Sequence, residues 1–254
     1  MNGHSVASVI PTDNGEDAVA SPLGLSQEAI VLHLRPYRET SCLVDLFSEG
    51  QGRVRLLAKG VRRSKQSQAD LLPFTRVRYA TGGRGELRLL TAHEAISGWP
   101  RLEGEALYCG FYVAELIIRL LPIEDAHPEL YAETLLVLQC LAHGMRADGV
   151  LRRFEKSLLE ELGYGLNLLE DLRGVPIEPS AVYRYHPEQG AERLGAGDSG
   201  IPGTALLALA AGEFEEDADL LWAKRLMRSI LDTHLDGRPL KSRELFHYFS
   251  RRRD

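Results

Sequence analysis

The chain has 254 residues, of which 44% are hydrophobic and 26% are charged. This composition is that of an ordinary globular protein with one large domain or two modest ones, and it excludes general disorder and collagen-like repeats. Thirty lysines and arginines against 36 aspartates and glutamates give a formal net charge of −6, which by itself argues against a nucleic-acid partner.

The charge is distributed unevenly along the chain. Residues 25–100 carry 12 basic and 7 acidic side chains, residues 101–223 carry 9 and 22, and residues 224–254 carry 9 and 4. Two basic segments therefore flank an acidic middle. A nucleic-acid binder needs only a local positive face, because charges beyond the Debye length of roughly 8 Å are largely screened. A chance partition of surface charge is the alternative explanation.

Residues 1–24 form a polar segment with three acids and no lysine or arginine, which favours a disordered tail without an export signal. Three widely spaced cysteines, Cys42, Cys109 and Cys140, predict neither a disulfide framework nor a zinc knuckle, and they indicate a reducing cytoplasm. The longest apolar stretch, residues 111–121, is interrupted by charges and covers about half of the roughly 20 residues that a membrane helix needs. We therefore expect a cytoplasmic protein with no membrane contact.

Between residues 25 and 100, short β-branched or alternating runs are separated by glycine and proline, a pattern typical of strands. The predicted strands cover residues 29–34, 41–47, 52–58, 74–79 and 86–91. Glycine-rich turns at residues 49–52 and 82–85 join two pairs of these strands. The one long connection, residues 59–73, is where a five-stranded oligonucleotide-binding (OB) barrel places an extra helix or a mobile loop. An OB-fold domain over residues 25–100 is therefore predicted.

Beyond residue 100 the apolar period becomes helical. Helices are predicted from residue 108 to the proline at 122, and over residues 130–141, 151–162, 203–211, 220–235 and 242–249. The stretch 172–203 is rich in glycine and proline, which predicts an irregular insertion with one short hairpin near residues 182–190. The expected fold class is α+β with two domains, the barrel and then a mostly helical domain over residues 101–254.

Several apparent enzyme signatures fail in their sequence context. Residues 195–200 match the letters of a dinucleotide fingerprint, but proline and glycine follow where a helix must begin. Glu155, Glu160 and Glu161 fall on the polar side of the helix predicted over residues 151–162, where a solvated face is the simpler interpretation. We find no nucleophile and base, no metal-ligand spacing and no phosphate-binding loop. The sequence therefore predicts no catalytic residue, no metal and no cofactor, and the protein is not expected to be an enzyme.

The barrel segment is rich in basic side chains that suit contact with a phosphate backbone. Four of them, Lys59, Arg62, Arg63 and Lys65, occupy seven consecutive positions of the long connection. Further arginines on the predicted strands and hairpins are Arg35, Arg38, Arg53, Arg55, Arg76, Arg78, Arg84 and Arg88. Tyr37, Phe74 and Tyr79 offer rings for base stacking, although strand aromatics lie more often in the core. A solvated barrel face is the alternative interpretation of the arginines.

Longer segments carry a more specific signal than any of these clusters. In the first half they are Arg-Pro-Tyr-Arg-Glu-Thr-Ser at 35–41, Gly-Arg-Val-Arg-Leu-Leu-Ala-Lys-Gly at 52–60, Leu-Pro-Phe at 72–74 and Gly-Gly-Arg-Gly-Glu-Leu at 82–87. In the second half they are Leu-Arg-Arg-Phe-Glu at 151–155, Leu-Gly-Tyr-Gly at 162–165 and Gly-Arg-Pro-Leu-Lys-Ser-Arg-Glu-Leu-Phe at 237–246. In this order and spacing, the sequence resembles the RecO family of bacterial recombination mediators over about residues 25–250.

The resemblance implies an OB-fold domain followed by a helical domain, in a cytoplasmic protein that lacks ATPase activity and joins the nucleoid when bound to DNA. It implies binding of single- and double-stranded DNA, annealing of complementary strands, and work with RecR and RecF to load RecA onto DNA coated by single-stranded-DNA-binding protein. Some members of the family carry a four-cysteine zinc site in the helical domain, between the helix that ends near residue 165 and the helices after residue 203. This sequence has no cysteine in that stretch, so we expect a loop or hairpin without metal.

The mechanism that the resemblance implies assigns roles to particular residues. The first choices for contact with DNA are Lys59, Arg62, Arg63, Lys65 and Arg84. A second basic patch suited to another strand consists of Lys224, Arg225, Arg228, Lys241, Arg243 and the run of arginines at 251–253. For residues 241–243, helix-start chemistry with Ser242 as the N-cap is an equal alternative to DNA contact.

In this family the helical domain also binds the acidic, apolar C-terminal tail of single-stranded-DNA-binding protein. Such a tail needs an apolar slot with arginine at its rim. Arg152 and Arg153, beside Leu151 and Phe154, are expected to supply that rim through charge-assisted hydrogen bonds to a carboxylate. Salt bridges within the domain are the alternative role for these two arginines.

Two other function classes stay open at the level of sequence. One is a DNA-processing or nucleotide-binding enzyme with an OB module, against which the missing catalytic constellation counts. The other is an RNA-binding protein, since OB barrels serve both nucleic acids. Competition between matched DNA and RNA oligomers distinguishes the last class from a DNA-binding protein.

Overall fold

The computed structural model of the protein describes residues 27–250 apart from residues 86, 196 and 236, with side chains described as far as residue 245. The tail predicted over residues 1–24 and the arginine run at 251–253 lie outside the described residues.

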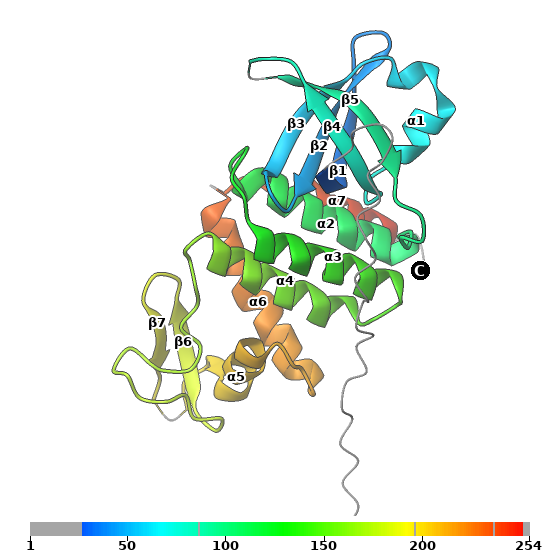
Figure 1. Ribbon diagram of the computed structural model, residues 1–254. Coiled ribbons are helices and arrows are strands. Elements are labelled where there is room, and N and C mark those ends of the chain that lie inside the picture. The colour runs from blue at the N-terminus through cyan, green and yellow to red at the C-terminus, as the bar shows by residue number, and fades with distance from the viewer. Residues whose placement is uncertain (1–26, 86, 196, 236, 251–254) are drawn as a thin grey trace, which may run out of the picture.

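The first half of the chain folds into a closed five-stranded barrel (Figure 1). Its strands are β1 (Gln27–Tyr37), β2 (Ser41–Ser48), β3 (Gly52–Ala58), β4 (Arg76–Gly82) and β5 (Arg88–Ala95). They lie in the order β1-β2-β3-β5-β4, and β1 pairs with β4 to close the barrel. Only the pairing of β3 with β5 is parallel. The OB-like barrel predicted from the sequence is confirmed.

The boundaries of the last two strands differ from those predicted. The fourth strand begins two residues later than expected, because Phe74 has a left-handed φ of +69° and turns the chain. The ring of Phe74 packs edge-on against Phe111 of the helical domain, with 5.3 Å between ring centroids. Tertiary packing thus holds a backbone conformation that non-glycine residues seldom adopt.

A short helical connection closes one end of the barrel. It consists of the 3-10 helix η1 (Val61–Arg63) and the helix α1 (Lys65–Asp70), so that of the two predicted alternatives the structure has the helix. The Ser64 hydroxyl accepts a hydrogen bond of 3.2 Å from the Ser67 backbone N–H and caps α1. The side chains of Val61 and Leu71 join the barrel core, which anchors both ends of the connection.

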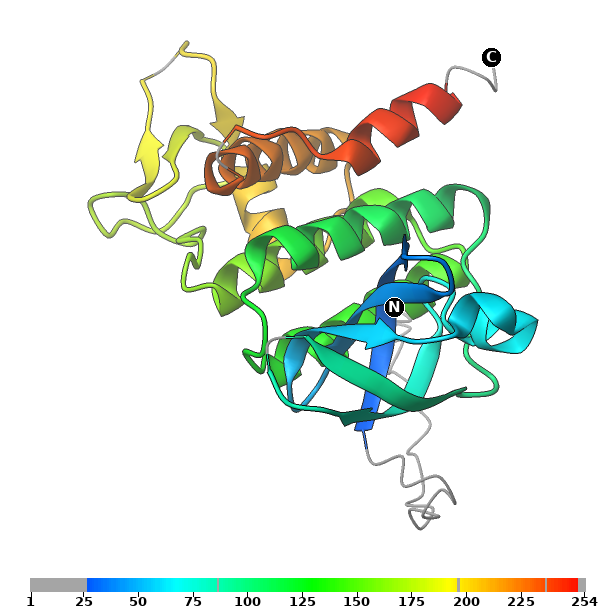
Figure 2. The same cartoon turned by 90° about the horizontal axis from the view of Figure 1, so that it is seen from above.

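The second half of the chain is mainly helical. Its helices are α2 (Gly104–Leu120), α3 (Pro128–Ala142), α4 (Ala147–Glu161), α5 (Gly203–Ala211), α6 (Asp217–His234) and α7 (Lys241–Ser250). In Figure 2, α2 lies between the barrel on one side and α7 on the other. Both faces of β1 and β2 are therefore covered, since Ile30, Leu32 and Phe47 belong to the helical core while their neighbours fill the barrel.

The insertion between α4 and α5 forms a small sheet at the end of the molecule away from the barrel (Figure 1). Its strands are β6 (Val182–His186), β7 (Gly190–Arg193) and β8 (Ile201–Pro202), in the order β7-β6-β8. The predicted hairpin is β6-β7, and the third strand is an addition to it. No group of three or more histidine, cysteine, aspartate or glutamate side chains in the described part of the chain is placed to hold a metal. Within the same residues, no helix is long and apolar enough to span a membrane.

The barrel is fastened to the helices where β3 begins. The Arg53 side chain donates a hydrogen bond of 3.2 Å to the carbonyl oxygen of Leu121, and the Glu124 backbone N–H donates one of 2.8 Å to the carbonyl oxygen of Arg53. Gly52 has φ +62°, and a Cβ there would lie 1.6 Å from the carbonyl oxygen of Asp125. Arg53 was expected on an exposed strand face, but it is buried in this junction. Position 52 beside it must be glycine, because any side chain there would collide with the backbone of Asp125.

Candidate nucleic-acid and peptide sites

The barrel carries an open groove of about 620 Å³ at the end where α1 lies. The turn between β1 and β2, the end of β3 and the segment before β5 form its walls. Its lining residues are Tyr37, Arg38, Thr40, Ser41, Leu57, Lys59, Gly60, Arg63 and Leu87. Three of the cations predicted to contact DNA, Arg38, Lys59 and Arg63, are thus brought together from turns that are distant in sequence.

The groove cations are exposed, and no acid of the described residues forms an ion pair with Arg38, Lys59 or Arg63. Arg38 lies in the β1–β2 turn with φ +55°, and its guanidinium carbon is 5.3 Å from the centre of the Tyr37 ring. An unpaired, solvated guanidinium or ammonium group is free to exchange water and counterions for a phosphate. The groove therefore has the charge and the openness that a phosphate backbone requires.

Arg62 has a different role from its neighbours. Its guanidinium donates hydrogen bonds to the carbonyl oxygens of Arg38 (3.3 Å) and Glu39 (2.8 Å). Its backbone N–H donates to the carbonyl oxygen of Thr40 at 3.1 Å. The side chain predicted to contact DNA thus braces the turn that presents Arg38 to the groove.

The remaining predicted barrel cations do not line the groove. Arg35 on β1, Lys65 at the start of α1 and Arg84 between β4 and β5 are exposed on neighbouring elements. Arg78 on β4 is exposed as well, but it forms ion pairs with Glu28 at 3.2 Å and Glu94 at 3.6 Å.

Of the three aromatic residues considered for base stacking, only Tyr37 reaches the groove. Its side chain is half-buried, which leaves part of the ring available. Tyr79 is fully buried in the barrel core, where burial raises the pKa of its hydroxyl, and Phe74 is buried against Phe111. A base-stacking role for Tyr79 or Phe74 is therefore wrong.

The helical domain has a second site, an apolar pocket of about 190 Å³ between α2, α4, α6 and α7. Its lining residues are Glu105, Tyr108, Cys109, Tyr112, Ala147, Asp148, Leu151, Arg152, Glu155, Lys224, Arg228 and Arg243. Burial raises the pKa of the Cys109 thiol to about 11, and the carboxylates of Glu105 and Asp148 act in the same direction. Cys109 is therefore a neutral, apolar part of the wall.

A buried ion pair forms the floor of the pocket. Arg152 and Glu155 are only 4% and 1% exposed, and they contact each other across one helical turn. The Tyr112 hydroxyl donates a hydrogen bond of 2.6 Å to Glu155 Oε1, and burial followed by the Glu155 charge raises the pKa of Tyr112. Arg152 Nε and Glu155 Oε2 are buried without a hydrogen-bond partner among the described residues. The interpretation of Glu155 as part of a solvated face was wrong.

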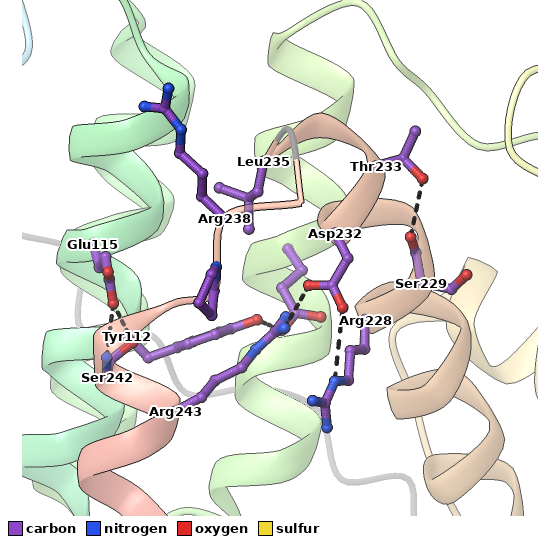
Figure 3. A network of polar contacts seen from close by, with 12 residues as sticks. Tyr112, Glu115, Arg228, Ser229, Asp232, Thr233, Leu235, Arg238, Ser242 and Arg243 are labelled. Atoms are coloured by element: carbon purple, nitrogen blue, oxygen red, sulfur yellow. Dashed lines mark hydrogen bonds and ion pairs between the residues drawn. The ribbon is translucent and has the colours of Figure 1, made fainter.

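The rim of the pocket consists of cations that are already paired. Lys224 Nζ lies 2.8 Å from Asp148 Oδ1, and Arg228 lies 3.8 Å from Asp232. Figure 3 shows Arg243 reaching toward the same Asp232, at 2.5 Å, and its guanidinium carbon is 5.8 Å from the centre of the Tyr112 ring. Three cations of the predicted second basic patch are thus paired with acids of their own domain, two of them with the same Asp232.

The other members of that patch lie away from the pocket. Arg225 is exposed, and its guanidinium carbon is 5.2 Å from the Trp222 ring centre. Lys241 begins α7, where the Glu115 carboxylate accepts hydrogen bonds from the Lys241 N–H (3.0 Å) and the Ser242 N–H (2.8 Å) (Figure 3). Glu115 also accepts a bond of 2.6 Å from the Ser242 hydroxyl. The helix start is thus capped by Glu115 of α2, with Ser242 inside the helix.

The two arginines predicted to hold a partner tail point to different sides of α4. Arg152 lines the pocket, whereas Arg153 is exposed and lies 3.7 Å from Glu133 of α3. Both arginines form the salt bridges within the domain that were the alternative. Only Arg152 is placed where a ligand of the pocket can approach it.

Two family models match nearly the whole described chain. Recombination protein O N terminal matches residues 24–99, and Recombination protein O C terminal matches residues 101–244. The chain belongs to the RecO family. Among its relatives, the DNA repair protein RecO of Halorhodospira halophila is 45% identical over 225 residues, covering 87% of this chain and 95% of the relative. That of Pseudomonas paraeruginosa is 45% identical over 223 residues, covering 87% and 94%.

Sequence reasoning missed the acids that hold the pocket cations in this RecO family member. Arg152 and Glu155 stand three residues apart in a helix, a spacing that brings side chains into contact, so this pair could have been predicted from the sequence. Asp148 and Lys224 are 76 residues apart on different helices, so no local pattern indicates their contact.

Proposed function

We propose that the protein is a DNA repair and recombination mediator that binds single- and double-stranded DNA and anneals complementary strands. With RecR and RecF, it helps to load RecA onto DNA coated by single-stranded-DNA-binding protein. The observation that carries the proposal is the barrel groove, in a chain of the RecO family. Arg38, Lys59 and Arg63 line it and form no ion pair within the described part of the chain. These cations contact phosphates without reading bases, as a mediator acting on any sequence requires.

Annealing of complementary oligonucleotides coated by single-stranded-DNA-binding protein, without ATP, tests this proposal. We expect fast annealing by the wild type and its loss in an Arg38→Glu, Lys59→Glu, Arg63→Glu variant. The same comparison on uncoated oligonucleotides separates the groove from the pocket. There the groove variant should again fail, whereas a control with the same charge change in the helical domain, Lys224→Glu, Arg225→Glu, Arg228→Glu, should anneal like the wild type. Absence of wild-type annealing contradicts the mediator function, and equal competition by a matched RNA oligomer favours the RNA-binding alternative.

We propose that the pocket binds the C-terminal tail of single-stranded-DNA-binding protein. An apolar terminal residue suits the apolar cavity, and the acidic residues and the free carboxylate suit the rim cations Lys224, Arg228 and Arg243. Capture of the tail would bring the coated strand to the protein that anneals it.

Titration of a labelled acidic tail peptide tests the pocket. A Lys224→Ala, Arg228→Ala variant is expected to bind the peptide about tenfold more weakly, because each lost ion pair contributes up to about 1 kcal/mol and the long-range attraction is reduced as well. Arg153→Ala is the matched control, since this arginine is exposed on the other side of α4. Unchanged peptide affinity in the double variant contradicts the assignment of the pocket.

A further inference from the structure

A solvent-exposed ion pair belongs to the lining of the helical pocket. Asp148 stands in the first turn of α4 and Lys224 in α6, and their side chains meet at 2.8 Å while both line the cavity. The two side chains are about half exposed, at 45% and 51%. This contact therefore lies on the part of the lining that a ligand can reach from solvent.

The pocket presents no cation that lacks an acidic partner. Arg152 contacts Glu155, Lys224 contacts Asp148, and Arg228 and Arg243 share Asp232. An anionic ligand therefore competes with an acid of the protein at each of these cations.

The pairs differ in how easily they exchange. Separating the buried Arg152–Glu155 pair leaves desolvated charges behind and is strongly unfavourable. Arg243 is only 19% exposed and is held by both Asp232 and Tyr112. The exposed pairs Asp148–Lys224 and Arg228–Asp232 are weak, and another carboxylate can replace the acid at little net cost. Of these two pairs, only Asp148–Lys224 has both partners in the lining of the pocket.

We propose that Asp148 sets the affinity and the selectivity of the pocket, by holding Lys224 until a carboxylate of an acidic peptide with an apolar C-terminal residue displaces it. This inference rests on the proposed binding of such a tail. The occupant follows from charge complementarity, since the pocket joins an apolar cavity to a rim of cations.

The arrangement discriminates between anions. A peptide with an apolar end gains the burial of that end in the cavity, which offsets the loss of the Asp148–Lys224 contact. A nucleic acid or a polyaspartate has no such end, so it must break the contact without that gain. A purely apolar peptide gains free energy from burying its end in the cavity, but it has no carboxylate side chains with which to displace Asp148 from Lys224. The pair therefore favours ligands that are both acidic and apolar at the terminus.

A double-mutant cycle tests the role of Asp148. The variants are Asp148→Asn, Lys224→Gln and their combination, and the probe is a labelled synthetic peptide of several aspartates that ends in leucine and phenylalanine with a free carboxylate. Asp148→Asn is expected to tighten peptide binding about two- to fivefold, the range typical of an exposed ion pair. This gain should disappear in the Lys224→Gln background.

Glu105→Gln is the matched control, because Glu105 lines the same pocket and has no ion pair with Lys224 among the described residues. It removes one negative charge, so any effect that it has should be equal with and without Lys224. If Asp148→Asn tightens binding equally in both backgrounds, long-range charge alone explains the gain and the inference is overturned. If the peptide binds to no variant and not to the wild type, the proposed tail binding fails as well, whereas binding without coupling overturns the role of Asp148 only.

Discussion

The barrel groove and the helical pocket contain the same kinds of side chain in opposite states. In the groove, Arg38, Lys59 and Arg63 are exposed and without acidic partners among the described residues. In the pocket, each cation is held by an acid of its own domain. A cation without an acidic partner can bind a polyanion directly, whereas a paired cation must first give up its acid. The pairing of a cation therefore matters more for binding than its presence on the surface.

The difference has a simple origin in the elements that carry these residues. The groove cations stand on turns and strand ends of a segment with a surplus of basic residues, where few acids are within reach. The pocket cations stand on packed helices, where a carboxylate on the same or the facing helix meets each of them. Glu155 and Asp148 come from the acidic middle of the chain, whereas Asp232, which holds Arg228 and Arg243, comes from the basic segment 224–254. The uneven charge along the sequence therefore accounts for part of the difference, and helix packing for the rest.

The largest expected effect is on stability, and it tests whether the pocket pairs are structural. Glu155→Ala leaves Arg152 buried without its partner, so the free energy of unfolding should fall by about 3 to 5 kcal/mol. Denaturant unfolding followed by circular dichroism measures this change. Glu155→Gln keeps an acceptor for the Tyr112 hydroxyl and should lose less. An unfolding midpoint equal to that of the wild type for Glu155→Ala would show that the pair is not structural.

The next effect concerns the groove. Arg38→Ala, Lys59→Ala, Arg63→Ala should weaken binding of single-stranded DNA about 100-fold at low salt, because three phosphate contacts are lost. The slope of log affinity against log salt should become shallower by about 2, as expected for three fewer contacts to a single strand. Fluorescence anisotropy over a range of salt concentrations measures both quantities. A slope that does not change would place the phosphate contacts elsewhere.

A smaller effect is expected when the helical cations are removed. Lys224→Ala, Arg225→Ala, Arg228→Ala should change the affinity for single-stranded DNA by less than about threefold, because Lys224 and Arg228 are already paired with acids. The same anisotropy titration applies. A loss comparable to that of the groove variant would erase the distinction between the two surfaces and restore the second patch as a DNA site.

The smallest effect depends on pH and belongs to the barrel. Burial lowers the pKa of His93 on β5 below its usual 6.5, although Asp70 and Ser67 of α1 act in the opposite direction. The unfolded chain then binds more protons than the folded one near this pH, so the free energy of unfolding should fall as the pH drops through 6.5. Amide hydrogen exchange of α1 measured at pH 7 and pH 5 follows the loss. His93→Gln should flatten the dependence, and an equally steep profile in that variant would assign it to another group.

The order of the elements could be predicted because its signals are local. Alternating strands, glycine turns and helical periods each depend on a few neighbouring residues, and they located the barrel and the helices after it. The left-handed Phe74 could not be predicted, because its conformation is fixed by Phe111 across the domain boundary. The third strand of the insertion, only two residues long, has no period to detect.

The sequence identified many of the basic residues at the candidate sites, but it did not identify the residues that they contact. The sequence singled out Arg38, Lys59 and Arg63, which line the groove, together with Arg62, which turns toward backbone carbonyls 23 and 24 residues earlier. A helical pattern predicts that a glutamate on the polar side is solvated, yet Glu155 is buried, where Arg152 and Tyr112 both contact its Oε1. Contacts between distant segments are set by tertiary structure, so local patterns do not report them.

The junction at Gly52 and Arg53 joins the barrel that carries the groove to the domain that carries the pocket. There the Arg53 side chain, a backbone hydrogen bond from Glu124 and the space left by Gly52 bring the two domains into close contact. On the proposed function, a tail seated in the pocket tethers the strand that its protein coats. The effective concentration of that strand at the groove is then set by the length of the tether, independently of the bulk concentration. On that function, one molecule would hold the coated strand at two points, its tail in the pocket and the strand itself in the groove.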